Sequence, residues 1–430
     1  MPKDFDVVIA GGGPAGAIAA WHAARDGRRV ALVDPDEPMP RIEGMGPRLH
    51  HWLEQVELFD AQAMQARQLV RQSRWGGTEY RQNVETVVER TALDRHLRRA
   101  AQAAGARLVV STARPRPGRV ELADGHVLEG AMVLDARGRK ALARQQTGGI
   151  ARRGPATIAI AAALDLAPGS PDGALVQPLD DGWLWLANLG NGRGWVQLTQ
   201  DTVDPAGRDP MTRLRDALAT ASDALPGILG IAGAPLVRDS SVVLPVPVTD
   251  LDIIAVGDAV AGMDPLSGHG MFFAISSALA VTAVRRTLER QDDRASRDLA
   301  LRFLNERQGL LYQRQARLGR DFIRTETARA QLPFWSRRIC FPDDLPLDPE
   351  PNRHHIARRI VVENGRLVDS EVLVTPHQPG GVAWVEGHPA AAICRAIEAG
   401  ASSAQLHRRF GRAGAIVTAW LAAQPAPAAG

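Results

Sequence analysis

Short apolar runs, glycine-rich turns and helical segments alternate along the first third of the chain. Residues 5–10 are almost uniformly apolar, which predicts a strand buried on both faces. A helix at 17–26, a strand at 29–33, a helix starting near residue 89 and a strand at 107–111 continue the alternation. Strands that alternate with helices predict a parallel sheet of the α/β class.

Further elements of this region are also predicted. Residues 49–71 have the spacing of an amphipathic helix, and residues 76–87 form a short excursion that contains strands. Thr91 and Asp94 fit the S/T-x-x-D/E pattern of a helix start. The apolar strand 131–135 ends in an acid followed by a glycine turn.

The pattern changes between residues 151 and 248, where apolar segments alternate with many Gly and Pro residues. The segments 156–164, 183–189 and 195–199 predict strands of one antiparallel sheet, and 210–225 predicts a helix. We interpret this region as a β-sheet substrate domain, to which residues 74–88 are a candidate addition. It is inserted into a discontinuous Rossmann-like domain made of residues 1–150 and 249–332.

The C-terminal part has a third pattern of apolar and polar residues. Residues 278–327 are mostly helical, and residues 333–355, dense in Pro and Asp, predict a linker. Residues 356–424 begin with a hairpin signal at Asn364-Gly365, followed by strands at 371–375 and 382–385. Helices are predicted at 389–399, 403–410 and 413–423. Strands followed by three short helices predict a small winged-helix-like domain.

Composition limits the classes of function. The formal charge is only +3, so it does not indicate a nucleic-acid partner. Lys3 and Lys140 are the only lysines. Cys340 and Cys394 are too few and too far apart for a disulfide framework or a metal site, so we expect free thiols and no metal. We predict a cytoplasmic protein without a membrane partner, because no signal peptide is visible and the longest apolar helical segment, 271–284, is too short to span a bilayer.

The first glycine turn predicts a dinucleotide site. Gly11, Gly13 and Gly16 form G-x-G-x-x-G between a strand and a helix, with Pro14 and Ala15 between the last two glycines. Asp34 ends the next strand, where it would accept hydrogen bonds from an adenosine ribose. The order of strand, glycines, helix, strand and acid makes this a specific signal, although a turn without a ligand is the alternative.

A second turn predicts the other half of the site. An apolar run from Leu251 ends in Gly257-Asp258, and a turn containing Pro265 leads into a helical segment through Gly268, His269, Gly270 and Met271. Bare backbone and a helix start suit a flat, electron-rich ligand. We interpret the two turns as halves of one FAD site.

Three motifs in this order carry a family resemblance: Gly11–Gly16 with Asp34, Asp135–Gly138, and Gly257-Asp258 with Asp264-Pro265. Residues 1–330 resemble the FAD-dependent monooxygenases of the aromatic-hydroxylase type and the related flavin-dependent halogenases. In such enzymes reduced flavin and O₂ give a C4a-hydroperoxide that delivers oxygen to an electron-rich ring.

The resemblance also implies roles for residues. Gly11, Gly13, Gly16 and Asp34 would hold the ADP half of FAD, Asp258 would contact the ribityl chain or pyrophosphate, and Pro265–Gly270 would line the isoalloxazine. Arg41 opens a glycine-rich loop that either lies beside the flavin or forms ordinary surface. His269 either moves a proton or packs against the flavin ring.

Halogenation is an alternative. Gly182–Trp185 partly resembles a halogenase signature, but Ala187-Asn188 stand where that family has Ile-Pro. Halogenases also use an active-site lysine, and neither Lys3 nor Lys140 is in the expected place. Trp183 and Trp185 are candidate substrate contacts on one strand face, with sheet core as the competing interpretation.

The C-terminal segment bears on the substrate. It resembles the small winged-helix domains that recognise peptides, and the flavoprotein monooxygenases of tryptophylquinone maturation act on a Trp within a polypeptide. The resemblance therefore implies a peptide or protein partner. Intramolecular packing, dimerisation and DNA binding through Arg408 and Arg409 are alternatives for this segment.

The electron source and the class of activity stay open. Electrons would come from transiently bound NAD(P)H or from a separate reductase, because no second nucleotide fingerprint is present. Hydroxylation of a small aromatic metabolite is one further hypothesis, and a non-oxygenating flavin-containing accessory protein is another.

Overall fold

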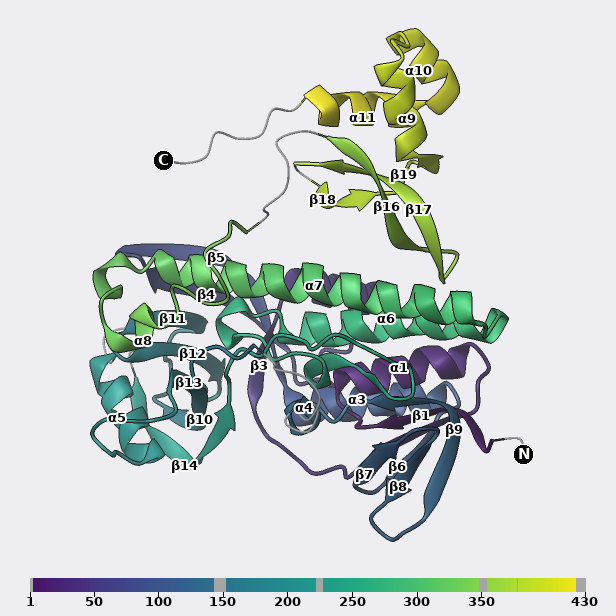
Figure 1. Cartoon of the computed structure of the whole chain (residues 1–430). Helices are drawn as coiled ribbons and strands as arrows, with labels where there is room; N and C mark the ends of the chain where they lie inside the picture. The colour runs from purple at the N-terminus through teal and green to yellow at the C-terminus, as the bar shows by residue number, and fades with distance from the viewer. Residues whose placement is uncertain (1–2, 143–151, 222–226, 348–353, 377, 423–430) are drawn as a thin grey trace. The chain divides into compact units, whose positions relative to one another are not determined.

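The computed structural model describes residues 3–142, 152–221, 227–347, 354–376 and 378–422. The chain forms two compact units: Met1–Thr282 with Leu311–Asp344, and Ala283–Leu310 with Leu345–Gly430. The long helices α6 (Gly270–Arg290) and α7 (Arg294–Arg324) contribute residues to both units. Figure 1 shows the elements of each unit.

A seven-stranded sheet is the base of the first unit. Its order is β6-β2-β1-β9-β8-β7, and β15 lies beside β9. The strands are β1 (Phe5–Ala10), β2 (Val30–Asp34), β6 (Arg107–Val110), β7 (Ala113–Arg116), β8 (Arg119–Leu122), β9 (Val127–Asp135) and β15 (Ile254–Ala255). Strands β6, β2, β1, β9 and β15 pair in parallel, which confirms the predicted Rossmann-like fold.

Helices α1 (Pro14–Arg25) and α3 (Arg90–Ala103) pack against each other, and α1 also contacts β1 and β2. The predicted start of α3 at Thr91 with Asp94 is wrong. Glu89 caps this helix, because its carboxylate accepts hydrogen bonds from the backbone N–H groups of Thr91 (3.0 Å) and Ala92 (2.6 Å). Asp94 instead pairs with Arg90, one turn earlier on the same face.

An eight-stranded sheet, ordered β14-β10-β13-β12-β11-β4-β5-β3, also belongs to the first unit. Its strands are β3 (Ile42–Met45), β4 (Arg67–Trp75), β5 (Thr78–Glu89), β10 (Thr157–Leu166), β11 (Gly173–Leu179), β12 (Gly182–Gly190), β13 (Arg193–Asp201) and β14 (Ile228–Asp239). The predicted antiparallel pairing of β10, β12 and β13 is confirmed, whereas β11 and β4 pair in parallel.

The helix predicted at 49–71 is wrong beyond its first turns. Helix α2 (Pro47–Gln55) ends early, turns follow, and β4 begins at Arg67. From residue 67 the side chains alternate between the two faces of the sheet, because β4 pairs with β5 and with the distant β11. Long-range strand pairing has overridden a local helical pattern.

The two faces of this sheet bury different cores. One face packs aliphatic side chains, mostly leucines, against α5 (Pro210–Thr220). The other face gathers aromatic and apolar side chains together with Leu266 of the second glycine turn. This second face carries Leu69, Trp75, Val87, Ala161, Ala174, Val176, Trp183, Trp185, Ala187 and Trp195.

This second face is concave. Strands β3 and β14 stand at opposite edges of the sheet, yet Arg238 Nη1 of β14 lies 3.9 Å from Glu43 Oε1 of β3. Trp185 of β12 also hydrogen-bonds Glu85 of β5 across β11 and β4. In a flat sheet β12 and β5 would be about 14 Å apart, and the edge strands β3 and β14 would be farther apart still. The sheet therefore curls around this side. We call it the concave face.

The predicted linker at 333–355 is wrong in its first part. Helix α8 (Pro333–Ser336) buries Phe334 and Trp335 in the core of the concave face, and the Trp335 indole donates to Leu179 O (3.0 Å). Arg317 of α7 pairs with Asp343 at 2.9 Å and fastens the following turns. Residues 333–344 therefore belong to the first unit, and 348–353 lie outside the described residues.

The second unit contains strands followed by three helices, as predicted. Its elements are β16 (His355–Glu363), β17 (Arg366–Thr375), β18 (Gln378–Val382), β19 (Trp384–Val385), β20 (His388–Pro389), α9 (Ala390–Glu398), α10 (Ser403–Phe410) and α11 (Arg412–Ala422). The Asn364-Gly365 turn has positive φ at both residues (49° and 75°), as the hairpin signal requires. The strand predicted at 371–375 is the end of β17 rather than a separate element.

Apolar side chains of β17 and the three helices form the core of the second unit, with Leu373, Ile393, Cys394, Phe410 and Val417 at its centre. In the part of helix α6 that belongs to this unit, the Thr287 hydroxyl accepts a hydrogen bond from Leu367 N at 2.9 Å. That contact fastens the hairpin to the helix.

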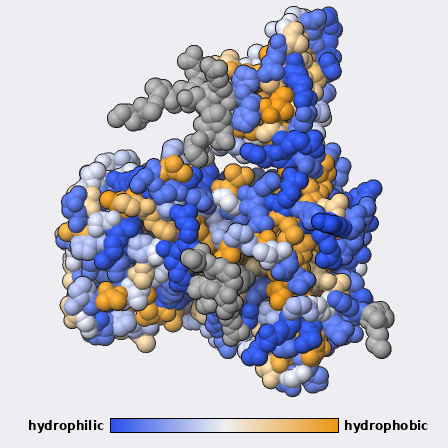
Figure 2. Space-filling model, in the orientation of Figure 1, coloured by the Kyte–Doolittle hydropathy of each residue, from blue (hydrophilic) through white to orange (hydrophobic). Residues whose placement is uncertain are grey.

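Helix α6 is longer than predicted from the sequence. Among the described residues it is the one helix long and apolar enough to cross a membrane by length and composition. However, 61% of its apolar window is buried inside the structure, as in the core helix of a folded domain. Hydrophilic residues cover most of the face drawn in Figure 2 and hydrophobic residues are scattered between them.

Candidate flavin site and substrate face

The first glycine turn has the geometry that a dinucleotide site requires. Gly11 has φ +106°, and a Cβ there would lie 2.4 Å from Ala136 O. A Cβ on Gly16 would lie 1.9 Å from Gly11 O, so only glycine allows α1 to approach the strand this closely. A Cβ on Gly13 would meet no atom within 4 Å. The turn is therefore packed from behind and open at Gly13, beside the first turn of α1, where Pro14 occupies the N-terminal position.

Asp34 lies at this turn, as predicted, and is already held by the protein. Its Oδ2 accepts from Gly12 N (2.7 Å), and Arg98 Nη1 of α3 lies 3.3 Å from its Oδ1. Arg98 also donates to Gly12 O at 3.2 Å. The sequence pattern did not single out Arg98, because one arginine on an arginine-rich helix carries no signal.

The structure brings the second glycine turn against the first. After β15 comes the short 3₁₀ helix η2 (Gly257–Ala259). Gly257 has φ +64°, and a Cβ there would lie 2.8 Å from the Cβ of Ala15. Its N–H donates to Ser277 Oγ of α6 at 2.7 Å. Asp258 keeps 43% of its side chain exposed next to this contact, so its carboxylate is available to a ligand.

The third motif and its neighbour Arg139 join the turns. Asp135 forms a two-bonded ion pair with Arg137 (2.7 and 2.9 Å). Arg139, at the start of α4 (Arg139–Leu142), donates to Ser241 O (2.8 Å) and Met263 O (3.1 Å) and lies 3.9 Å from Asp258. Its role was not predicted from the sequence.

The turn between η2 and α6 exposes backbone. Asp264 caps the 3₁₀ helix η3 (Pro265–Ser267) by accepting from Leu266 N (2.8 Å), and burial raises the pKa of Asp264. Gly268 has φ +62°, and Cβ atoms on Gly268 or Gly270 would meet nothing within 4 Å. Pro265 is half-buried, and Met271 is buried in the first turn of α6. We call the backbone of Gly11 and Gly257, which is closely packed, together with the open backbone of Gly13, Gly268 and Gly270, the glycine cradle.

His269 stands between the cradle and an aromatic cluster. Its ring lies 6.4 Å from that of Phe272 and 6.2 Å from that of Phe273, and Phe273 in turn contacts Tyr312. The Arg48 guanidinium lies 5.1 Å from the Phe272 ring on its other side. His269 is therefore half-buried, with aromatic rings that fix its orientation.

Arg41 belongs to a cluster of three arginines around one buried carboxylate. Arg41, Arg90 (2.7 Å) and Arg238 (3.9 Å) all contact Glu43. Burial alone would raise the pKa of Glu43, but the charges of the three arginines hold it well below its usual range. Burial, together with the positive charge of Arg41, lowers the pKa of Arg238 to about 10. The loop that begins at Arg41 is thus held in place by ion pairs and carries a net positive charge.

The predicted substrate residues Trp183 and Trp185 both lie on the concave face, 3% and 8% exposed, and Trp195 lies on the same face. The register of β4 and β5 adds two charged residues, because Glu85 is directly opposite Leu69, and Arg71 is beside Ala174. The sequence offered one signal for Glu85. It is two residues from Val87 in the predicted strand region 76–87, so both side chains lie on one strand face, and a carboxylate is unusual on a buried face.

Glu85 is an unusual group on this face. Its Oε2 is buried without a hydrogen-bond partner among the described residues, and so is Arg71 Nε. Burial raises the pKa of the Glu85 carboxyl, and the charge of Arg71 and the hydrogen bond from Trp185 offset that rise only in part. Buried polar atoms without partners are costly and mark places where a ligand atom can bond.

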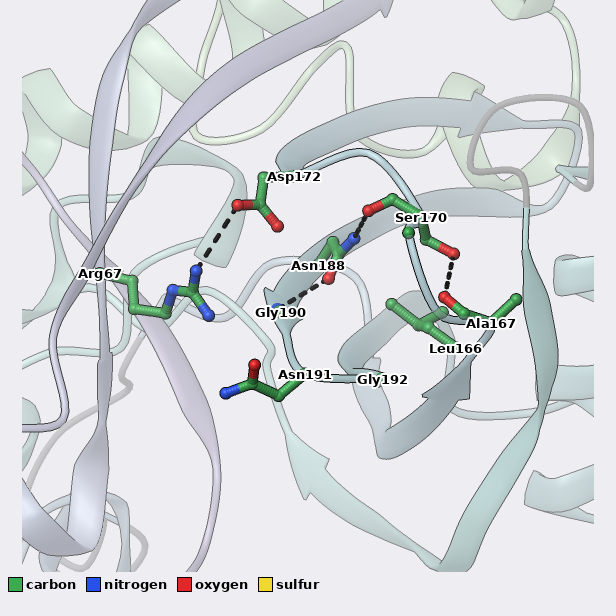
Figure 3. A pocket seen from close by; sticks show the side chains of 10 residues that line it. Arg67, Leu166, Ala167, Ser170, Asp172, Asn188, Gly190, Asn191 and Gly192 are labelled. Carbon is green, nitrogen blue, oxygen red and sulfur yellow. Dashed lines mark hydrogen bonds and ion pairs between the residues drawn. The ribbon is translucent and has the colours of Figure 1, made fainter.

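A small cavity of about 250 Å³ lies at the loop end of the eight-stranded sheet, and Figure 3 shows its lining. The Asn188 amide donates to Ser170 O (3.0 Å) and Pro171 O (2.8 Å) and accepts from Gly190 N (2.8 Å). Arg67 and Asp172 pair across its opening at 3.5 Å. None of the predicted site residues lines this cavity. We therefore assign Asn188 a structural role, in which its hydrogen bonds hold the neighbouring loops together.

Comparison with known proteins agrees with this geometry. Residues 6–144 match the family model for FAD-dependent oxidoreductases. A solved peptidyl tryptophan dihydroxylase, QhpG, essential for tryptophylquinone cofactor biogenesis, is 33% identical, with a TM-score of 0.79 over 98% of both chains. The flavin-dependent halogenase CmlS shares the fold at 18% identity, with a TM-score of 0.74 over 96% of this chain and 92% of that one. The menaquinone reductase of Mycobacterium tuberculosis is 28% identical over 316 residues, covering 63% of this chain and 74% of that protein.

The fold, the cradle and these relatives define a flavin-dependent oxidoreductase. The chain belongs to the FAD-dependent oxidoreductases, and over nearly its whole length it is similar to the peptidyl tryptophan dihydroxylase QhpG.

Proposed function

We propose that this enzyme hydroxylates an electron-rich aromatic ring, a Trp side chain within a peptide or protein during quinone cofactor maturation. One observation carries the proposal: the 33% identity to a peptidyl tryptophan dihydroxylase extends over 98% of both chains. That coverage includes the C-terminal unit, but so does the match to the halogenase CmlS at 18% identity, so the proposal rests on the higher identity to the dihydroxylase.

The residues present fit FAD. The pyrophosphate would lie at Gly13, where the backbone is open at the start of α1, and the isoalloxazine would lie along Pro265–Gly270. Asp34 and Asp258 would accept hydrogen bonds from ribose and ribityl hydroxyls. When bound, FAD would supply the redox chemistry by accepting electrons and using them to activate O₂.

The chain's own side chains would position the substrate and exclude water. A substrate indole entering the concave face would meet Trp183 and Trp185, and the Glu85 carboxylate would accept its N–H, as it already accepts the indole N–H of Trp185. Such a hydrogen bond holds the ring in place and increases its electron density. His269, fixed by Phe272 and Phe273, would hold or move a proton at the flavin end.

The electrons would come from NAD(P)H that binds transiently or from a separate reductase. The glycine cradle accounts for one dinucleotide, and the sequence has no second fingerprint. We also propose a cytoplasmic location, because both cysteines are free thiols and NAD(P)H is a cytoplasmic reductant.

The partner polypeptide would dock on the second unit. Strand β16 is at the edge of its sheet, paired with β17 alone among the described residues, so its outer backbone groups could pair with an added strand.

The test is incubation of the FAD-loaded enzyme with a Trp-containing partner peptide, NAD(P)H and ¹⁸O₂, followed by mass spectrometry. We expect peptide mass to rise by one or two ¹⁸O atoms on the Trp residue. Flavin reduction without oxygen in the peptide would overturn the oxygenase proposal. Equal hydroxylation of a free aromatic acid would overturn the polypeptide substrate, and chlorine incorporation in chloride buffer would indicate a halogenase.

A further inference from the structure

The second unit brings together three side chains that can bind a metal ion. His354 immediately precedes β16, while Cys394 and Glu398 are four residues apart on the same side of α9. Their ligand atoms all lie within 4.8 Å of one another. The two cysteines of the sequence do not make such a site by themselves; folding supplies the other two ligands.

The distances suit a tetrahedral ion. Glu398 Oε1 lies 3.5 Å from His354 Nε2 and 3.6 Å from Cys394 Sγ. An ion bound at about 2.0–2.3 Å to nitrogen, oxygen and sulfur requires ligand atoms roughly 3.3–3.8 Å apart. Two of the three edges of a coordination triangle are therefore already the right length, and a small movement of the His354 ring suffices for the third.

The donor set selects the class of ion. Thiolate sulfur and imidazole nitrogen favour borderline d-block cations such as Zn²⁺ and Co²⁺, whereas Ca²⁺ and Mg²⁺ prefer oxygen alone. Cys394 is fully buried in the core of the unit, while His354 and Glu398 are 34% and 53% exposed. The cysteine would anchor the ion from below, and water would reach the fourth position from outside.

We propose that His354, Cys394 and Glu398 form a binding site for one Zn²⁺-class ion. The ion would tie the start of the edge strand β16 to helix α9. It would hold the strand end against the helical core of the unit, in addition to the packing of Ile356 against that core and the 3.5 Å contact between His354 and Glu398. The proposal depends only on this cluster and not on the proposed reaction.

The chain offers a matched control, because Cys340 is its only other cysteine and is exposed and distant in sequence. The full-length, FAD-loaded protein would be freed of metal with a chelator and dialysed to equilibrium against Zn²⁺. Bound zinc would then be measured by mass spectrometry. We expect one zinc per chain in the wild type and in Cys340→Ser, and at least tenfold weaker binding in Cys394→Ala, His354→Ala and Glu398→Gln.

Two results would overturn the proposal: no zinc in the wild type above the level in the dialysis buffer, or unchanged binding in His354→Ala and Glu398→Gln. Both of those residues are at the surface, so their variants keep the test decisive even if Cys394→Ala fails to fold. A second probe, Co²⁺, should give a thiolate charge-transfer band in a difference spectrum against the metal-free flavoprotein. Retention of that band in Cys394→Ala would equally contradict the site.

Discussion

The glycine cradle and the concave face lie in the same unit, but one offers backbone groups to a ligand and the other offers side chains. The cradle is backbone: its residues are glycines whose missing side chains leave room for a ligand or for close packing. The concave face is side chains, with tryptophans, Glu85 and Arg71 supplied by separate strands. A ligand in the cradle would be bound by groups that every residue has, whereas a ligand on the concave face would be chosen by groups that mutation can change one at a time.

The largest effect should come from closing the cradle from behind. Gly11→Ala puts a Cβ 2.4 Å from Ala136 O in a residue whose φ is +106°. The strained backbone and the clash should lower the free energy of unfolding by roughly 3 kcal/mol or more. Thermal unfolding followed by circular dichroism would measure this, and purified protein should carry little flavin. A variant with wild-type Tm would contradict the tight turn.

Gly13→Val should separate binding from folding. Gly13 has φ −69° and open space at its Cβ position, so the apoprotein should fold as stably as the wild type. The valine would instead intrude on the pyrophosphate, and FAD affinity should fall roughly 10- to 100-fold. Titration of apoprotein with FAD, followed by flavin fluorescence, measures the change. Wild-type affinity would place the pyrophosphate elsewhere.

On the concave face, Glu85→Leu should lower kcat/KM for a Trp peptide roughly 10- to 100-fold, the value of a hydrogen bond to a charged group. Val84→Ala is the matched control, because Val84 is the adjacent residue on the opposite face and is 51% exposed. With 1-methyltryptophan in the peptide, which lacks the N–H, wild type and Glu85→Leu should become alike. A persistent difference would indicate that Glu85 only supports the fold.

A pH profile should sharpen this further. Because burial raises the pKa of Glu85 above the ordinary 4.5, the carboxylate should gain its proton at a higher pH than usual, and kcat/KM should fall as pH decreases through that value. Stability should change in the opposite direction. For a carboxyl whose pKa rises on folding, the contribution to stability is greatest at low pH and is lost as pH rises through the folded pKa. Glu85→Gln should lack both trends, and an unchanged acid limb in that variant would assign the profile to another group.

The smallest effect on activity should come from Asn188. Asn188→Ala removes three hydrogen bonds that hold the loops around the cavity of Figure 3 and should lower the free energy of unfolding by about 1–3 kcal/mol. Below the Tm, kcat/KM should stay within twofold of the wild type. A larger loss of kcat/KM would give that cavity a part in substrate binding.

The cradle could be predicted from the sequence because its requirements are local. Gly11, Gly13 and Gly16 each satisfy a need of the turn itself, and the strand and helix around them are adjacent in the chain. The close approach of Gly257 to Ala15 was expected only because each turn resembles one half of an FAD site. The sequence contains no pattern that links two residues so far apart.

The concave face could not be assembled in the same way, since its members come from six strands and from parts of three helices, η3, α7 and α8. The helix predicted over β4 and the linker predicted over α8 failed for a common reason: Trp75 and Trp335 are ordered by each other's rings, 5.4 Å apart, across 260 residues of sequence. Arg98 was missed because a lone arginine acquires meaning only from what long-range packing places opposite it, whereas Glu85 was missed although its alternation with Val87 offered a local signal.

The curled sheet has a consequence for the newly made chain. Strands β3 to β5 leave the ribosome about 150 residues before β14, the strand whose Arg238 meets Glu43. At a synthesis rate of roughly 5–20 residues per second, the early strands wait roughly 8–30 seconds for the others. During that interval β4 and β5 can form a hairpin, but its apolar side has no partner sheet. A chaperone that shields residues 67–89 during translation would therefore raise the yield of folded protein more than one supplied after release.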